Sequence, residues 1–390
     1  MQLDGVTGAR KIAPAIPPTH PERPALVRRL GELAAFHGFG DRPVERAVPP
    51  PLIVPPAGSF ELPGSGVGAL TAGFSRDGNE LVAVASGGEL VRWDLVHGRL
   101  ASRLALGGEP LALAALAPDL DRVACRAGEE PLVVRDAVNG MQVAALGEGA
   151  FSAIAWSPCG KRIATGSRTG DVAVWDAASG RCVTSWWAHP APVQAVAFDF
   201  EGAQVGTGAA DGRVTLWAAD SGKRTLRVIE PENHPQGVGA ATRAGSPRAL
   251  VFTGGGAYLM AGLTGGGLVL WDRESGHRLW TPPAHAAAVR SVRAVHGGLS
   301  LATSGQDGAL VLWDALTGEP LAMLTGHQAP AFALAVSPDG SRIASGGGDA
   351  WLLLWDLPGR TCDMNEAATR RALALYARRA LERLGGRPPD

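Results

Sequence analysis

The sequence lacks the features that mark secreted, disulfide-bonded and membrane-spanning proteins. Its four cysteines form no CxxC pair and no zinc-ligand spacing, so neither a disulfide framework nor a zinc site is expected. No apolar run approaches the roughly 20 residues that a membrane helix needs, and the N-terminus has no apolar signal core. These absences predict a cytoplasmic protein with reduced thiols and no membrane span.

Net charge and lysine are also scarce. The chain has 36 basic and 37 acidic residues, so no overall attraction to nucleic acid or to a membrane is expected. Only three of the basic residues are lysines, namely Lys11, Lys161 and Lys223. This arginine bias, with abundant alanine and glycine, is typical of a high-GC, bacterial-type genome. Arginine-rich patches therefore carry less weight as signs of function.

Glycine and apolar residues, by contrast, are abundant, and they follow a repeat. The chain has 53 glycines and is 46% hydrophobic, which suffices for a packed core. Short strand-like runs ending in Trp-Asp recur along it, with two weaker copies among them. The repeat positions are separated by 42, 40, 42, 54, 42 and 42 residues, and they are Trp93, Arg135, Trp175, Trp217, Trp271, Trp313 and Trp355.

Each repeat contains four short strands separated by turns. Apolar and β-branched residues fill the strands, and tight-turn signals such as SPCGK and SPDGS join them. Long helical periodicity is absent between residues 60 and 360. A four-stranded unit of this length, repeated seven times, predicts an all-β, seven-bladed propeller with four antiparallel strands per blade.

Three of the repeats share a polar pattern beyond the Trp-Asp pair. A histidine lies 28 residues before the tryptophan, a serine or threonine ten before it, and an aspartate six before it. On these motifs, the chain resembles the WD-repeat family of β-propellers over about residues 59–360. The resemblance implies a buried, hydrogen-bonded structural relay in each of the three blades. Its members are His189, Thr207, Asp211 and Trp217; His285, Thr303, Asp307 and Trp313; and His327, Ser345, Asp349 and Trp355.

The same residues also have metal-binding and catalytic interpretations, which the pattern disfavours. The three histidines belong to three different repeats, and each has its own aspartate. His327, Ser345 and Asp349 are the residue types of a hydrolase triad, but the serine lies within a strand and no GxSxG elbow is present. Glycine-rich stretches such as 264–271 lack the ending of a phosphate-binding loop. No catalytic residue, metal or cofactor is therefore expected.

The resemblance also implies a partner-binding rim. WD-repeat proteins often contact partners through residues three and five after the relay histidine and through the residue before the relay aspartate. The rim is small, mildly basic and poor in carboxylates, so an acidic or phosphorylated peptide is a candidate partner. Transferred by offset, its residues are Arg168, Gln194, Arg248, Arg290, Gln306 and Phe332.

Two segments lie outside the repeats. Residues 1–58 are a proline-rich arm with 11 of the 29 prolines and one short helix pattern, and residues 362–390 carry an amphipathic, arginine-rich helix pattern. The propeller is expected at 59–361, with Ser59–Leu62 completing its last blade. The C-terminal helix is interpreted as packing on the ring, with binding to acidic lipid, nucleic acid or an acidic protein as the alternative.

These features favour a non-catalytic scaffold or adaptor that binds other proteins as a subunit of a larger assembly. Two alternatives stay open. One is an enzyme or small-molecule binder that uses the central channel, which would require polar groups on the inner strands. The other is a docking subunit that acts through its terminal helices.

Overall fold

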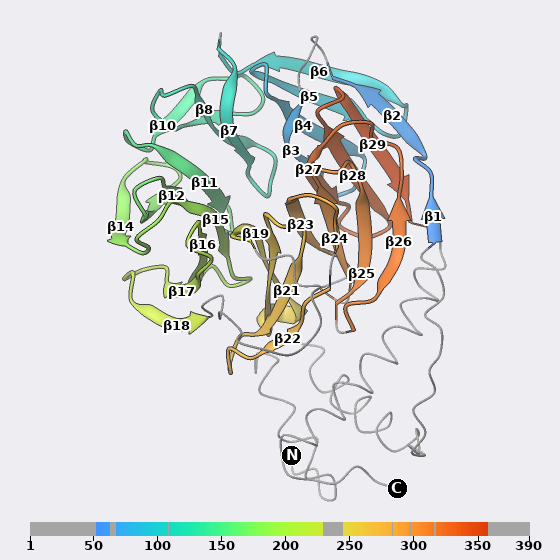
Figure 1. The fold of residues 1–390 in the computed structure, drawn as a ribbon. Helices are drawn as coiled ribbons and strands as arrows, with labels where there is room; N and C mark the ends of the chain where they lie inside the picture. Colours follow the sequence, from blue (N-terminus) through green and yellow to red (C-terminus); the bar gives the residue numbers. More distant parts are fainter. Residues whose placement is uncertain are drawn as a thin grey trace, which may run out of the picture.

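The computed structural model of the chain describes residues 52–357 except 63–67, 108, 229–244, 283, 296–297, 299 and 316. Seven sheets are arranged around a common centre (Figure 1). Each contains four antiparallel strands, and one of them gains a fifth, parallel strand, which confirms the predicted all-β, seven-bladed propeller. The predicted helices in 1–58 and 362–390 lie outside the described residues. Within the described residues, no helix is long and apolar enough to cross a bilayer.

Blades 1 to 4 follow one another along the chain, and each begins with its innermost strand. Their strands are β3 (Ala69–Phe74), β4 (Glu80–Ala85), β5 (Glu89–Asp94) and β6 (Arg99–Ala105); β7 (Leu111–Leu116), β8 (Arg122–Ala127), β9 (Val133–Asp136) and β10 (Gln142–Ala145); β11 (Phe151–Trp156), β12 (Arg162–Ser167), β13 (Asp171–Asp176) and β14 (Cys182–Trp187); β15 (Val193–Phe198), β16 (Gln204–Ala209), β17 (Val214–Ala218) and β18 (Arg224–Val228).

Blades 5 to 7 continue the ring, with one short 3-10 turn, η2 (Gly254–Gly256), inside blade 5. Their strands are β19 (Pro247–Thr253), β20 (Tyr258–Leu263), β21 (Leu268–Asp272) and β22 (Arg278–Trp280); β23 (Val289–Val295), β24 (Ser300–Gly305), β25 (Leu310–Asp314) and β26 (Pro320–Leu324); β27 (Ala331–Val336), β28 (Arg342–Gly347) and β29 (Trp351–Asp356).

The SPCGK turn shows why the sequence folds into hairpins. Gly160 has a φ of 69°, a left-handed conformation that glycine adopts without a steric penalty. Its N–H donates to the carbonyl of Ser157, and the Ser157 hydroxyl accepts from the N–H of Arg162. The turn therefore satisfies its own backbone and sends β12 back along β11.

The core lies between blades rather than within one blade. The inner strands contact one another in a closed ring, in the order β3, β7, β11, β15, β19, β23, β27 and back to β3. One apolar cluster joins Leu216 of blade 4 to Phe252 and Trp271 of blade 5. Because both faces of a blade are buried in this way, the strands contain few charged residues.

The N-terminal strand closes the ring. β2 (Gly58–Glu61) pairs antiparallel with β29 and becomes the outer strand of blade 7, as the sequence predicted for Ser59–Leu62. Leu62, directly after β2, is 1% exposed and packs in a cluster with residues of blades 1 and 7. The start of the chain therefore holds the first and last blades together.

A second N-terminal strand extends blade 6. β1 (Leu52–Val54) pairs in parallel with the outer strand β26, which gives this blade five strands. The sequence predicted these residues to belong to the arm and not to the ring. The three apolar residues of β1 lie between prolines. Because proline has no N–H to donate to a neighbouring strand, only a short strand can form here, and it pairs with the otherwise open edge of blade 6.

Candidate functional site

Blade 6 contains the predicted relay as a continuous hydrogen-bonded chain. His285 Nδ1 lies 3.0 Å from an Asp307 oxygen, and His285 Nε2 lies 2.9 Å from the Thr303 hydroxyl. Trp313 Nε1 donates to the same hydroxyl at 2.9 Å. An indole nitrogen only donates and a carboxylate only accepts, so the Thr303 hydroxyl accepts from Trp313 and His285 Nδ1–H donates to Asp307. The Thr303 hydroxyl lies within reach of two further groups, His285 Nε2 and the Val311 carbonyl at 3.3 Å.

The relay also joins two loops on the same face of the ring. Asp307 lies in the turn after β24 and accepts a hydrogen bond from the backbone N–H of Ala286 at 2.7 Å. Burial raises the pKa of Asp307, but the hydrogen bonds from His285 and Ala286 outweigh it and hold the pKa below its usual value. The carboxylate therefore stays ionised and holds the two loops together.

Blade 7 reproduces only three of the four relay members. His327 Nδ1 lies 2.9 Å from Asp349, and His327 Nε2 lies 2.6 Å from the Ser345 hydroxyl. Trp355 is fully buried, but its Nε1 has no hydrogen-bond partner among the described residues. The inclusion of Trp355 in the relay was therefore wrong. A serine lacks the γ-methyl group that restricts a threonine side chain, and here its hydroxyl turns to the histidine alone.

In blade 4 the hydrogen bonds of the relay threonine are intact, but the histidine lies farther from the relay aspartate. Thr207 bonds both His189 Nε2, at 2.7 Å, and Trp217 Nε1, at 2.9 Å. His189 Nδ1, however, lies 3.9 Å from Asp211, and Asp211 Oδ2 accepts no hydrogen bond from a residue that the structure describes. Burial is the main cause that lowers the pKa of His189, and the charge of Asp211 offsets it only in part.

Pro190 explains why Asp211 lacks the backbone hydrogen bond that its counterparts in blades 6 and 7 accept. In blades 6 and 7 the residue after the histidine donates its backbone N–H to the aspartate, from Ala286 at 2.7 Å and from Gln328 at 3.1 Å. Pro190 occupies this place in blade 4, and proline has no N–H. The fixed sequence offset therefore did not reveal that the Asp211 contact would be incomplete.

Replacing Pro190 with alanine is expected to stabilise the protein by about 1 kcal/mol. A hydrogen bond to a carboxylate contributes about 1.5–3 kcal/mol, and loss of the proline ring costs about 0.4–1 kcal/mol through the unfolded chain. Urea unfolding measures the change, with Ala286→Pro as the reverse substitution, which should destabilise. A P190A midpoint below that of the wild type would contradict this explanation.

The remaining blades show the effect of losing relay residues. In blade 3, Thr165 still accepts from Trp175 Nε1 at 2.9 Å without a histidine. In blade 5, Ala261 replaces the hydroxyl residue, and Trp271 Nε1 has no hydrogen-bond partner in the described ranges. In blade 2 the pair is Cys125 and Arg135. Burial raises the pKa of the Cys125 thiol, and the charge of Arg135 opposes this rise.

Three of the predicted rim residues come together on blades 5 to 7. The Arg290 guanidinium lies over the Phe332 ring, 5.1 Å from its centroid. Burial lowers the pKa of Arg290, and the positive charge of the nearby Arg248 lowers it further. The backbone leaves room for the ring, because a Cβ added at Gly348 would lie 3.2 Å from Phe332.

The other three rim residues are less closely connected to this group. Gln194 accepts a hydrogen bond from the Ser246 hydroxyl at 2.9 Å, which links blades 4 and 5. Arg168 lies close enough to Arg126 for its charge to reduce the pKa of that residue, after burial as the main cause. Gln306 is exposed in the turn before Asp307. Of the six predicted rim residues, Arg290 and Phe332 thus contact each other, and the charge of Arg248 lies nearby. The other three residues are more dispersed.

Sequence reasoning missed two arginines. Arg126 is 7% exposed and donates to the carbonyl of Phe151 in the next blade, and Arg293 is exposed although it belongs to the inner strand β23. Neither occupies an offset that the family uses for partners. A count of charges on the inner strands would have identified Arg293. In the described part of the chain, no group of three or more His, Cys, Asp or Glu residues is placed to hold a metal.

Two family models match the chain. The model described as WD domain, G-beta repeat matches residues 318–356, which cover most of blade 7. A second model, PQQ_2, described as outer membrane protein assembly factor BamB, matches residues 144–335. No curated protein matched the chain. Seven four-stranded blades, the repeated Trp-Asp strands and the WD-domain match together show a seven-bladed β-propeller that carries a WD-type repeat.

Proposed function

We propose that this propeller is a non-catalytic platform that binds other proteins and serves as a subunit of a larger assembly. The contact of Arg290 with Phe332 on the rim, with the charge of Arg248 beside it, is the observation that carries the proposal. An arginine and an aromatic ring are the residue types that contribute most to protein interfaces. The second matching model is described as an assembly factor, which agrees with a role in handling other proteins.

The rim is held in place before any partner arrives. Arg290 and Phe332 lie on the inner strands β23 and β27, each of which is flanked by two other inner strands. The Gln306 turn is anchored by its own N–H to Ala288 and by the relay through Asp307. A fixed surface lowers the entropy cost of binding, so this arrangement supports a docking role.

The partner that best fits this rim is an acidic or phosphorylated peptide. Within the described part of the chain, Arg290 Nε is buried without a hydrogen-bond partner, and no ion pair links Arg248 or Arg290 to an acidic residue. A carboxylate or phosphate is the natural partner of a guanidinium group and forms two parallel hydrogen bonds with it. Phe332 would contribute apolar contact next to the charge.

Two other functions remain as competing proposals. Docking through the terminal segments depends on residues that the structure does not describe, and deletion of 362–390 tests it. If assembly is unchanged without this segment, the rim proposal gains support. A role for the centre of the ring would need polar groups on the inner strands, whose charged residues are Arg248, Arg290 and Arg293.

A pull-down from the native host tests the rim. Tagged wild-type chain is compared with an Arg290→Ala/Phe332→Ala double variant and with Arg278→Ala, whose exposed arginine lies on the outer strand β22. We expect at least one partner to be retained by wild type and R278A and lost from the double variant. Capture of the same proteins by all three chains, or turnover of a substrate that depends on Arg290, would contradict the proposal.

A further inference from the structure

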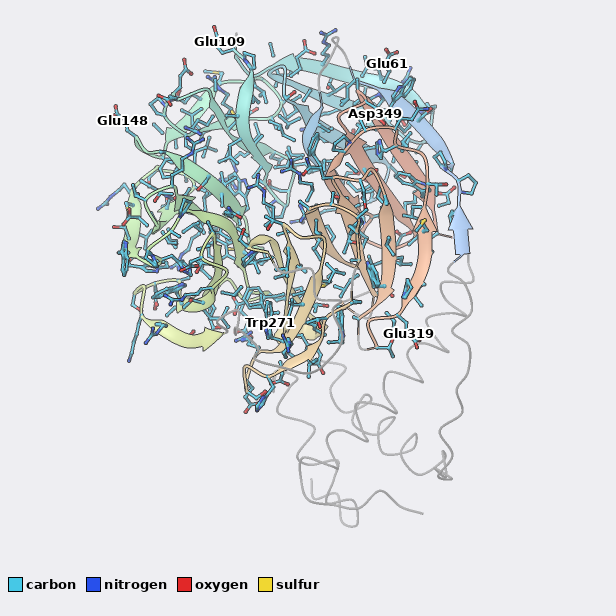
Figure 2. All side chains as sticks on the ribbon, viewed as in Figure 1. Glu61, Glu109, Glu148, Trp271, Glu319 and Asp349 are labelled. Carbon is cyan, nitrogen blue, oxygen red and sulfur yellow. The ribbon has the colours of Figure 1, made fainter. Side chains whose placement is uncertain are left out.

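The outer edges of the blades differ in how they are protected from pairing with another chain. The outermost strands β2, β6, β18 and β22 each carry a charged residue, which discourages such pairing, and Figure 2 shows that of β2, Glu61, at the outer edge of the ring. The outermost strands β10, β14 and β26 carry no charge. Of these, β10 has only four residues, and β26 is covered by β1. The longest uncharged outer strand to which no other described strand is added is therefore β14.

Blade 6 shows what kind of segment covers an uncharged outer strand in this propeller. The three residues of β1 lie parallel to β26 and opposite its last three residues. The carbonyl of Val54 accepts a hydrogen bond from the N–H of Thr325 at 3.2 Å. The Val54 side chain is 9% exposed and lies in a cluster with Leu324 and with Leu353 of blade 7. A short, extended and apolar segment therefore satisfies both the backbone and the side chains of this edge.

The backbone of β14 offers the same hydrogen-bonding groups. Counted from the residue opposite the repeat tryptophan, Trp187 occupies in blade 3 the place that Thr325 occupies in blade 6. The next residue, Ala188, donates its N–H inward, to the carbonyl of Gly170 at 3.0 Å. Because successive N–H groups of a strand point to opposite sides, the N–H of Trp187 points outward, as that of Thr325 does. The N–H of Ser185, two residues earlier, points the same way.

Both faces of β14 are apolar beside this edge. Trp186 faces blade 4, where its ring centroid lies 5.8 Å from that of Trp217, and it takes the place that Leu324 has in blade 6. Trp187 points to the opposite face and is 64% exposed, and Val183 on the same strand is 45% exposed. A strand added here would therefore have an indole ring beside it on each face.

We propose that β14 binds an extended, uncharged segment of a partner protein, which adds to blade 3 as a fifth strand in the way that β1 adds to blade 6. The outward backbone groups of Ser185 and Trp187 hold the segment, and the two indole rings favour apolar, β-branched residues within it. The surface lies on the outer edge of blade 3 (Figure 1), whereas the rim pair lies on the inner strands of blades 6 and 7. It is thus a second protein-binding surface, and it does not depend on the rim.

A labelled peptide of sequence PPTVTVTPP tests this edge by fluorescence anisotropy with the full chain. Its threonines and valines favour a strand, and its terminal prolines limit self-association. We expect it to bind, and the same peptide with N-methyl groups on its central residues to bind at least about tenfold more weakly, because it cannot donate backbone hydrogen bonds. Trp187→Ala should weaken binding by about tenfold. Leu100→Ala, which changes an exposed side chain of the outer strand β6, should bind as wild type does.

Hydrogen exchange locates the bound peptide. The amides of Ser185 and Trp187 should exchange more slowly in the complex, and those of β6 should be unchanged. The proposal would be overturned by a lack of binding up to about 1 mM peptide, by unchanged exchange of β14, or by equal affinities of wild type and W187A. Circular dichroism checks that W187A is folded.

Two further measurements separate this proposal from its alternatives. If sedimentation shows a wild-type dimer and a W187A monomer, a second copy of the chain occupies the edge, and the assignment to a partner segment is wrong. The Arg290→Ala/Phe332→Ala variant should bind the peptide as wild type does. The edge proposal and the rim proposal can therefore fail separately.

Discussion

Replacing Thr303 with valine is expected to lower the free energy of unfolding by about 2–4 kcal/mol. The substitution keeps the shape of the side chain and removes only the hydroxyl. That hydroxyl binds His285 Nε2 and Trp313 Nε1, each at 2.9 Å, inside a fully buried site. Two buried polar groups would then lack partners, and each such loss costs about 1–3 kcal/mol. Urea unfolding followed by tryptophan fluorescence measures the change.

Blade 7 supplies the matched comparison for this prediction. Ser345→Ala removes a hydroxyl from the same position, but there only His327 loses a partner, because Trp355 Nε1 is already unpaired. Its expected cost is about 1–2 kcal/mol. If T303V and S345A destabilised the protein equally, the fourth member of the relay would contribute nothing, and the energetic interpretation of the Thr303 relay would be incorrect.

Replacing Leu62 with alanine is expected to cost about 2–4 kcal/mol, which is the usual range for removing a buried leucine side chain. Leu62 is 1% exposed and lies in the cluster that joins Trp93 of blade 1 to Leu352 of blade 7. Its backbone N–H also donates to the carbonyl of Ala350 at 2.7 Å. The cavity would therefore form at the closure of the ring. Hydrogen exchange of residues 58–61 should increase together with the loss of stability.

Leu100→Ala is the control for the closure prediction. Leu100 is 54% exposed on the outer strand β6, and substitutions at such places change stability by within about 0.5 kcal/mol. If L62A behaved like L100A, with unchanged exchange at β2, the N-terminal strand would not hold the ring closed. A loss in L62A with protection of β2 retained would show that the cluster stabilises the blades without anchoring the strand.

The candidate site shows where prediction from the sequence works and where it stops. Fixed offsets identified His285, Thr303 and Trp313 together, because each offset corresponds to one place in the blade. They did not reveal that Pro190 deprives Asp211 of a donor, since that partner is a backbone N–H across a loop. They also did not show that Ser345 turns away from Trp355, because the rotamer depends on packing.

The number of blades, the four antiparallel strands of each blade and the closing strand were determined by the sequence alone, since a repeated pattern of apolar strands and glycine turns permits one local structure; the added strand β1 was not. The tertiary structure decided which side chains meet. Closing the ring brought Arg290 onto Phe332 of the next blade, although no local pattern relates them. The physical reason is that hairpins form from neighbouring residues, whereas the rim and the inner wall are assembled from strands about 40 residues apart, a spacing set by the length of a blade.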